Sequence, residues 1–138
     1  MKRFAIVAAL LALVLAACVP AAGTVNPQQL NGSWSLLNIQ YPDGEVATPD
    51  FGEYSIEFDF EEDRMFVVAD CNQGSASFEA NEDGSIVLGP LTQTMMACPP
   101  GSMGNEYALQ LGMASSYGFV DGFLHMRTLD GVALVFSR

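Results

Sequence analysis

Three cysteines, Cys18, Cys71 and Cys98, carry the most specific chemistry in this 138-residue sequence. A cysteine thiol can form a disulfide, bind a metal or carry a lipid. An odd number of cysteines in an exported protein leaves one thiol without a partner. The segments around each cysteine therefore decide which of the three stands alone.

The first cysteine ends an apolar segment. Lys2 and Arg3 precede "FAIVAALLALVLAA" at residues 4–17. As a helix this segment would be about 21 Å long, whereas the hydrocarbon core of a bilayer is about 30 Å thick. The segment is therefore typical of a secretory signal peptide rather than of a permanent membrane span.

The residues beside the expected cleavage point, "LAAC" from Leu15 to Cys18, resemble the lipobox of bacterial lipoproteins. In that family the signal peptide is cut just before the cysteine, which then carries lipid. Several acyl chains hold a protein on a bilayer far more firmly than one does. The resemblance implies a cleaved signal peptide over residues 1–17 and lipid attachment at Cys18. A plain signal peptide that happens to end near a cysteine is the alternative.

The residues after the signal indicate a location, a tether and one domain. In bacterial lipoproteins, an aspartate directly after the lipidated cysteine resembles an inner-membrane retention signal. Val19 follows Cys18 instead, which favours the outer membrane of a bacterial envelope, facing the periplasm. Residues 19–30 show no helical or strand period and contain Pro20 and Pro27. We therefore expect a lipidated cysteine and flexible tether over residues 18–30, and one domain over residues 31–138.

The expected mature chain is strongly acidic. It holds all 16 acidic residues, no lysine and only three arginines, Arg64, Arg127 and Arg138. Such a surface repels phosphate backbones, so we expect no nucleic-acid partner. It would attract a cationic protein or metal ions; a purely solubilising role is the alternative. We expect a monomer.

The expected domain reads mainly as strands. In "EYSIEFDF" at 53–60 apolar and polar residues alternate, so one face of a strand enters the core and the other meets water. Two Asp-Gly pairs, at 121–122 and 130–131, favour tight hairpin turns. Further strands are expected at 32–41, 64–70, 75–80, 85–89, 117–120, 123–129 and 132–138.

One segment has a helical period instead. Apolar residues recur at helical spacing from Met103 to Ala114, and Ser102 can cap the start of a helix. Together these patterns predict an α+β fold. It is a single small domain with a curled, open-barrel-like antiparallel sheet covered by one α-helix.

Several segments of the expected domain match one known pattern. They are "GSWSL" at 32–36, "CNQGSASF" at 71–78, "LGPLTQTMMAC" at 88–98, the helix with Glu106, and "LDGVALVF" at 129–136. The most specific part is Cys-Asn at 71–72 together with Thr-x-Met-x-Cys at 94–98. In these segments the sequence resembles the META domain family, which includes HslJ-type heat-shock lipoproteins. The resemblance implies an α+β fold, an envelope or stress-related setting and no catalytic residues.

The chain departs from this family's pattern at three positions. Asp70 and Ala76 stand where the family often has glycine, and Met95 stands where it often has arginine. If that arginine binds a ligand in relatives, this chain lacks the contact.

The remaining two cysteines are expected to pair. With Cys18 carrying lipid, Cys71 and Cys98 are left in an oxidising compartment where disulfides persist. Two buried reduced thiols are one alternative. A redox or metal pair is another, although neither cysteine has a C-x-x-C partner or a nearby histidine.

Other candidate groups are expected to be structural. Six methionines follow residue 17, and we expect them to fill core gaps rather than bind copper. "DFEED" at 59–63 is expected to be a solvated turn rather than a calcium site. His125 should share the outer face of a strand with Arg127, with no partner for acid–base work.

The sequence therefore predicts a protein that is not an enzyme and needs no cofactor or metal. We expect a lipid-anchored envelope protein with a structural or stress-related role, acting through protein contacts. The alternative is a periplasmic binding or inhibitor module that recognises a cationic protein such as a lysozyme.

Overall fold

A computed structural model describes residues 23–138. The expected signal peptide at 1–17 and Cys18 lie outside the described residues. The described chain holds one short 3-10 helix, one α-helix and ten strands. In chain order they are η1 (Pro27–Leu30), β1 (Gly32–Gln40), β2 (Val46–Ala47), β3 (Tyr54–Asp59), β4 (Arg64–Ala69), β5 (Asn72–Ala80), β6 (Ile86–Leu88), β7 (Thr92–Gln93), α1 (Gly104–Gly112), β8 (Ala114–Val120), β9 (Phe123–Thr128) and β10 (Ala133–Ser137).

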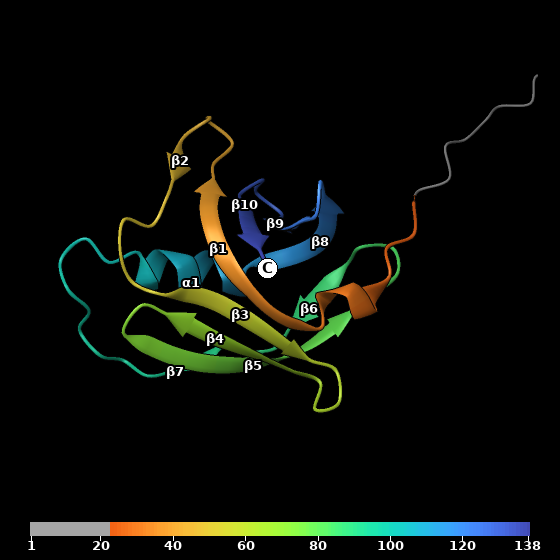
Figure 1. Ribbon diagram of the computed structural model, residues 1–138, viewed down its shortest axis with the longest axis horizontal. Helices are drawn as coiled ribbons and strands as arrows, with labels where there is room; N and C mark the ends of the chain where they lie inside the picture. The colour runs from red at the N-terminus through yellow and green to blue at the C-terminus, as the bar shows by residue number, and fades with distance from the viewer. Residues whose placement is uncertain (1–22) are drawn as a thin grey trace, which may run out of the picture.

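The strands form one antiparallel sheet that curls into a nearly closed barrel (Figure 1). The order is β6-β5-β4-β3-β1-β10-β9-β8, with β2 paired to β1 and β7 to β5. The two ends of this order meet, because the Tyr117 N–H donates to the Gly84 carbonyl at 2.7 Å and Ser85 bridges to Ser116. This confirms the predicted fold class of a curled sheet with one helix.

The alternating pattern of β3 explains how the strands build the core. Tyr54, Ile56 and Phe58 are buried, whereas Glu57 between them is exposed. The Phe58 ring packs edge-on against Phe78 of β5, with ring centroids 5.0 Å apart. Burial of each large apolar side chain stabilises the fold by about 1.5–3 kcal/mol.

The Asp-Gly pair after β8 makes a tight turn. Asp121 and Gly122 both have positive φ, 52° and 86°, and Val120 pairs with Phe123 across the turn. A two-residue turn of this kind matches the twist of the strands it joins. The expected hairpin is confirmed, and β8 begins earlier than predicted, at Ala114.

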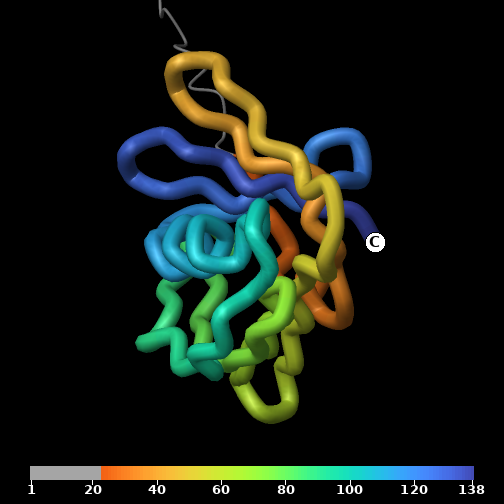
Figure 2. The backbone as a smooth tube through the Cα atoms, turned by 90° about the vertical axis from the view of Figure 1, so that its left-hand side faces the viewer, coloured from red at the N-terminus to blue at the C-terminus, as the bar shows by residue number. Residues whose placement is uncertain are grey.

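Helix α1 lies between the β9–β10 hairpin and the strands β4 and β5 (Figure 2). Its buried face carries Tyr107 and Leu111, and the Tyr107 ring contacts both Tyr54 and Phe136. The Ser102 hydroxyl accepts a hydrogen bond from the Gly104 N–H at 3.1 Å. The N-cap residue is Met103 rather than the predicted Ser102, and no side chain caps the helix there. No helix in residues 23–138 is long and apolar enough to cross a bilayer.

The ordered domain begins earlier than the sequence indicated. Residues 27–30 form η1, and Leu30, which lies within the predicted tether, is fully buried. The Trp34 indole N–H donates to the Leu30 carbonyl at 2.7 Å, and the Val25 N–H donates to the Glu82 carbonyl at 2.8 Å. These hydrogen bonds hold residues 25–30 against the domain. A flexible tether can therefore extend no further than residue 24.

Candidate functional site

Cys71 and Cys98 are joined by a disulfide. Cys71 lies between β4 and β5, and Cys98 lies in the loop that connects β7 to α1. The bond therefore ties this loop to the edge of the barrel. The two thiols are used for crosslinking, so neither is a reduced core thiol or a metal ligand.

Asn72 fastens the same loop from inside. Its side chain is only 5% exposed. The amide oxygen accepts hydrogen bonds from the Met96 N–H at 2.7 Å and the Thr94 hydroxyl at 2.9 Å. The amide nitrogen donates to the Met96 carbonyl at 3.0 Å. One side chain thus satisfies three polar groups of a loop that has little regular structure of its own.

The Cys-Asn and Thr-x-Met-x-Cys segments therefore form one structural unit, here called the loop latch: Cys71, Asn72, Thr94, Met96 and Cys98. The Gln73 N–H adds a hydrogen bond to the Thr94 hydroxyl at 3.1 Å. The sequence predicts the pairing of the two cysteines but no role for Asn72 or Thr94. The available signal was an asparagine beside a cysteine, because an amide offers both a donor and an acceptor to a loop backbone.

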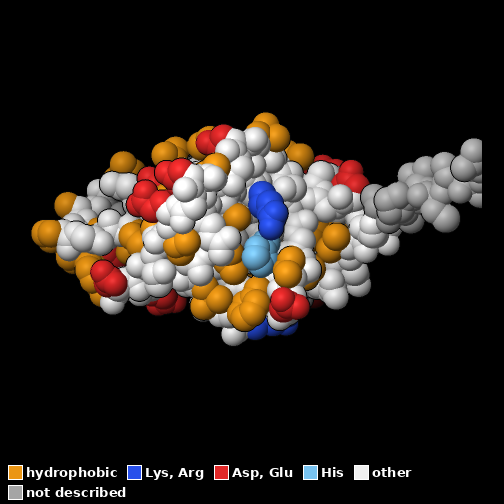
Figure 3. All heavy atoms as spheres, turned by 90° about the horizontal axis from the view of Figure 1, so that it is seen from above, with side chains coloured by type: hydrophobic (Ala, Val, Ile, Leu, Met, Phe, Trp, Pro, Cys, Tyr) orange, Lys and Arg blue, Asp and Glu red, His pale blue; other side chains and the backbone are white. Residues whose placement is uncertain are grey.

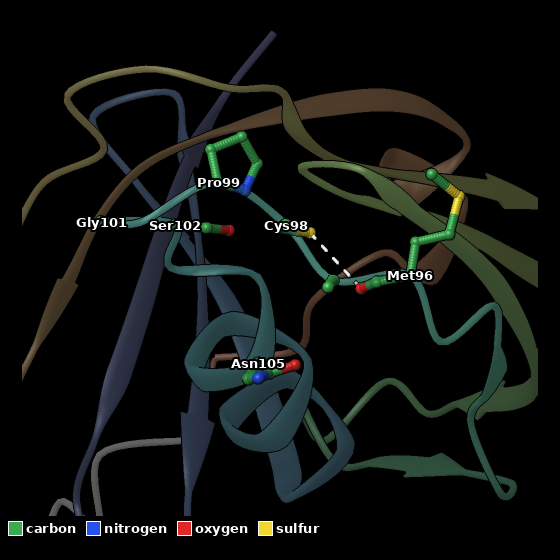
Figure 4. Close-up of a pocket in the computed structure, with 7 residues that line it drawn as sticks. Met96, Cys98, Pro99, Gly101, Ser102 and Asn105 are labelled. Carbon is green, nitrogen blue, oxygen red and sulfur yellow. Dashed lines mark hydrogen bonds between the residues drawn. The ribbon is translucent and has the colours of Figure 1, made fainter.

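A shallow depression of about 310 Å³ lies between the loop latch and α1 (Figure 4). It is lined by uncharged residues, among them Pro99, Ser102 and Asn105. The Met96 side chain points away from Ser102 and Asn105, and the Cys98 sulfur lies 4.0 Å from the Met96 carbonyl oxygen. Because this lining contains no carboxylate or histidine and its cysteine is in the disulfide, it offers neither a general base nor an activated nucleophile.

The family model for the META domain matches residues 28–138. The chain belongs to the META domain family. This match starts within η1, in agreement with the ordered start of the domain. Membership points to a bacterial protein associated with the cell envelope, and the META domain is not a known enzyme family.

Solved structures show the same fold. A protein from Burkholderia xenovorans, solved by NMR, matches with a TM-score of 0.67 and 22% identity, over 80% of this chain and 84% of its own. A DUF4847 family protein from Bacteroides vulgatus, a crystal structure at 1.00 Å, matches with a TM-score of 0.57 and 15% identity, over 78% and 92%. A search of curated proteins found no match.

The backbone explains why the family often has glycine at the position of Asp70. Asp70 has φ = 60°, the left-handed region in which glycine is unstrained. Aspartate tolerates this region better than most residues. One carboxylate oxygen of Asp70 is buried without a hydrogen-bond partner among the described residues.

The methionines do not all lie where the sequence placed them. Met65 and Met126 are buried as expected, but Met95, Met96 and Met113 are 85%, 62% and 47% exposed. The prediction that the methionines fill core gaps is wrong for these three. Met95 and Met96 lie in the latched loop, which has no strand period to turn them inward.

The helix residue Glu106 is occupied by structural hydrogen bonds. Its carboxylate accepts from the Tyr41 hydroxyl and from the Gln110 amide, both at 2.9 Å. Burial, and then the hydrogen bond to Glu106, raise the pKa of Tyr41 to about 12. Tyr41 therefore stays protonated and links the end of β1 to α1.

His125 and Arg127 share the outer face of β9, as predicted, because Leu124 and Met126 are fully buried. Partial burial, and then the charge of Arg127, lower the pKa of His125 from 6.5. The carboxylates of "DFEED" lie at the β3–β4 turn. No cluster of metal-ligating side chains occurs in the described part of the chain.

Proposed function

We propose that this META protein is a lipid-anchored protein of the bacterial envelope, held by Cys18 and acting through protein contacts rather than catalysis. One observation supports lipid attachment at Cys18. The disulfide joins Cys71 to Cys98, so Cys18 is the one cysteine of the three that has no disulfide partner among the other two. It follows an apolar segment of the length that signal peptides have.

The disulfide also supports an envelope location. Structural disulfides persist in the periplasm and are rare in the bacterial cytosol. Because Val19 follows Cys18, the outer membrane, facing the periplasm, is the proposed site. A protein held there by several acyl chains works within reach of other envelope proteins.

The latched loop supports a role in protein contacts. The disulfide and Asn72 hold its backbone, while Met95 and Met96 expose most of their side chains. Methionines are adaptable apolar side chains that recur at binding surfaces. A loop that is already ordered loses little further backbone entropy when a partner binds.

Crosslinking in intact cells tests this function. A photoreactive amino acid at position 95 should capture an envelope partner, whereas the same probe at Glu57, exposed on β3, should not. Deleting the gene should raise sensitivity to detergents or envelope-directed antibiotics. Equal crosslinking at both positions, with no sensitivity change under any tested stress, would reject contact through this loop.

A second candidate is an inhibitor of a cationic envelope enzyme such as a lysozyme. Most carboxylates of the domain are exposed, including Glu61, Glu62 and Asp63 at the β3–β4 turn. Such a surface attracts a basic protein at low salt. Titration of the purified chain against lysozyme at low and high salt tests it, and absence of inhibition at low salt removes it.

A further inference from the structure

A second surface has no place in the proposed function: a groove of about 340 Å³ along the outer face of β8 and β9. Val25 and Val120 are among the apolar residues that line it. Phe119 lines it too, but its ring packs inward against Trp34. Val120 is 49% exposed, and its hairpin partner Phe123 is 40% exposed. Apolar side chains gathered on one face in this way commonly mark a contact surface.

The groove also contains an arginine and a histidine in an otherwise acidic protein. His125 and Arg127 both line it. Figure 3 shows the histidine with a basic side chain beside it and hydrophobic side chains around both. Arg64 and Arg138 each donate a hydrogen bond within the domain. The Arg127 guanidinium makes no hydrogen bond or ion pair with residues 23–138, so it is available to an external anion.

The position of the anchor determines what this groove faces. Six residues separate Cys18 from Val25, which the domain holds through Glu82. Fully extended, that segment spans about 25 Å. A domain of this size has a diameter of about 35 Å, so the segment cannot reach around to the opposite side. With Cys18 in a bilayer, the surface around Val25 therefore stays close to the headgroups.

We propose that the groove on β8 and β9 rests on the phospholipid surface that holds the anchor. Arg127 and His125 face phosphate oxygens, and Val120 and Phe123 lie at the boundary between headgroups and acyl chains. Arginine suits this role because its guanidinium binds phosphate with two parallel hydrogen bonds. The inference rests on the proposed acylation of Cys18.

The charges around the groove select the headgroup. Asp121 lies in the β8–β9 turn, and Glu82 and Asp83 lie near Val25. A purely anionic bilayer would repel these carboxylates. Phosphatidylethanolamine instead presents an ammonium beside each phosphate, so it can satisfy both signs. The proposed surface is therefore rich in phosphatidylethanolamine.

Paramagnetic relaxation on the mature, lipidated protein tests the contact. The protein is placed in nanodiscs of phosphatidylethanolamine and phosphatidylglycerol in which a small fraction of headgroups carries a gadolinium chelate. Amide signals are compared with nanodiscs that carry a diamagnetic lutetium chelate. We expect residues 117–127 to lose at least twofold more intensity than residues 54–69 of β3 and β4.

A matched pair of variants separates a specific contact from simple proximity. Phe123→Ser with Arg127→Glu removes the exposed aromatic ring beside the groove and the arginine within it. Phe66→Ser with Arg64→Glu makes the same changes on β4, where Phe66 is 41% exposed. The first variant should level the attenuation across the domain, and the second should keep the wild-type pattern.

Attenuation that is uniform in the wild type, or strongest on β3 and β4, overturns the proposal. Intact mass identifies failure of the anchor separately, because it reports whether Cys18 is acylated. If it is not, co-sedimentation with vesicles of the same lipids decides the groove's role. Binding should then fall at least threefold in the Phe123→Ser, Arg127→Glu variant, and equal binding overturns the proposal.

Discussion

Replacing Asn72 with alanine should release the latched loop without unfolding the barrel. The change removes the three hydrogen bonds with the Met96 N–H, the Met96 carbonyl and the Thr94 hydroxyl. It also removes two weaker contacts from the amide nitrogen to the disulfide sulfurs. Each such bond contributes about 1 kcal/mol net. The disulfide still holds Cys98, and water can reach part of the exposed loop. We therefore expect Asn72→Ala to lower the free energy of unfolding by about 2–3 kcal/mol.

Urea unfolding followed by circular dichroism measures this difference by linear extrapolation. Amide hydrogen exchange supplies a local readout, because the Met96 N–H donates directly to Asn72. Its exchange should accelerate in the variant, while amides of β3 and β4 should change only as much as global stability does.

Asn105→Ala is the matched control. Asn105 is exposed on α1, and its side chain forms no hydrogen bond with residues 23–138. Alanine also favours a helix, so this variant should match or slightly exceed the wild type. If Asn72→Ala stays within about 0.5 kcal/mol of the wild type and Met96 exchange is unchanged, the latch does not hold the loop.

Three further predictions concern stability. Replacing Cys71 and Cys98 together by alanine should lower the free energy of unfolding by about 3.6 kcal/mol, because the disulfide no longer restricts the unfolded chain. The urea m-value should rise because the unfolded state expands. An unchanged urea midpoint would contradict this. Asp70→Gly should stabilise the fold by about 1 kcal/mol, since it relieves a positive φ and removes a buried carboxylate oxygen that lacks a partner; a lower melting temperature would count against that reasoning. The pKa of His125 is lowered in the folded state, so below about pH 6.5 the unfolded chain binds more protons at this residue than the folded chain does. Acidification through this range therefore lowers the free energy of unfolding, which is highest above about pH 6.5 as far as His125 is concerned. His125→Gln should therefore lose less stability than the wild type between pH 7.5 and 5.5, and parallel pH profiles would refute this.

The sequence predicted those parts of the fold that local patterns determine. The alternation from Tyr54 to Phe60 predicts β3, and the pair Asp121 and Gly122 predicts the β8–β9 hairpin, because both signals act within a few residues. The helix was expected over 103–114 and runs from Gly104 to Gly112.

The missed elements depend on distant partners. Strand β7 is two residues long and exists because it pairs with β5 beside the latch. The 3-10 helix η1 is held by the Arg138 guanidinium, which donates to the Gln29 carbonyl at 2.7 Å from 109 residues along the chain. The roles of Asn72 and Thr94 likewise arise from a contact across more than twenty residues. No local period reports such contacts.

Intact mass of the protein purified from its native membranes is the most direct test. The account predicts a chain that begins at Cys18, carries acyl groups there, and is about 2 Da lighter than its fully reduced form because Cys71 and Cys98 have each lost a hydrogen. A chain that begins elsewhere without lipid, or one that retains both hydrogens, would contradict it.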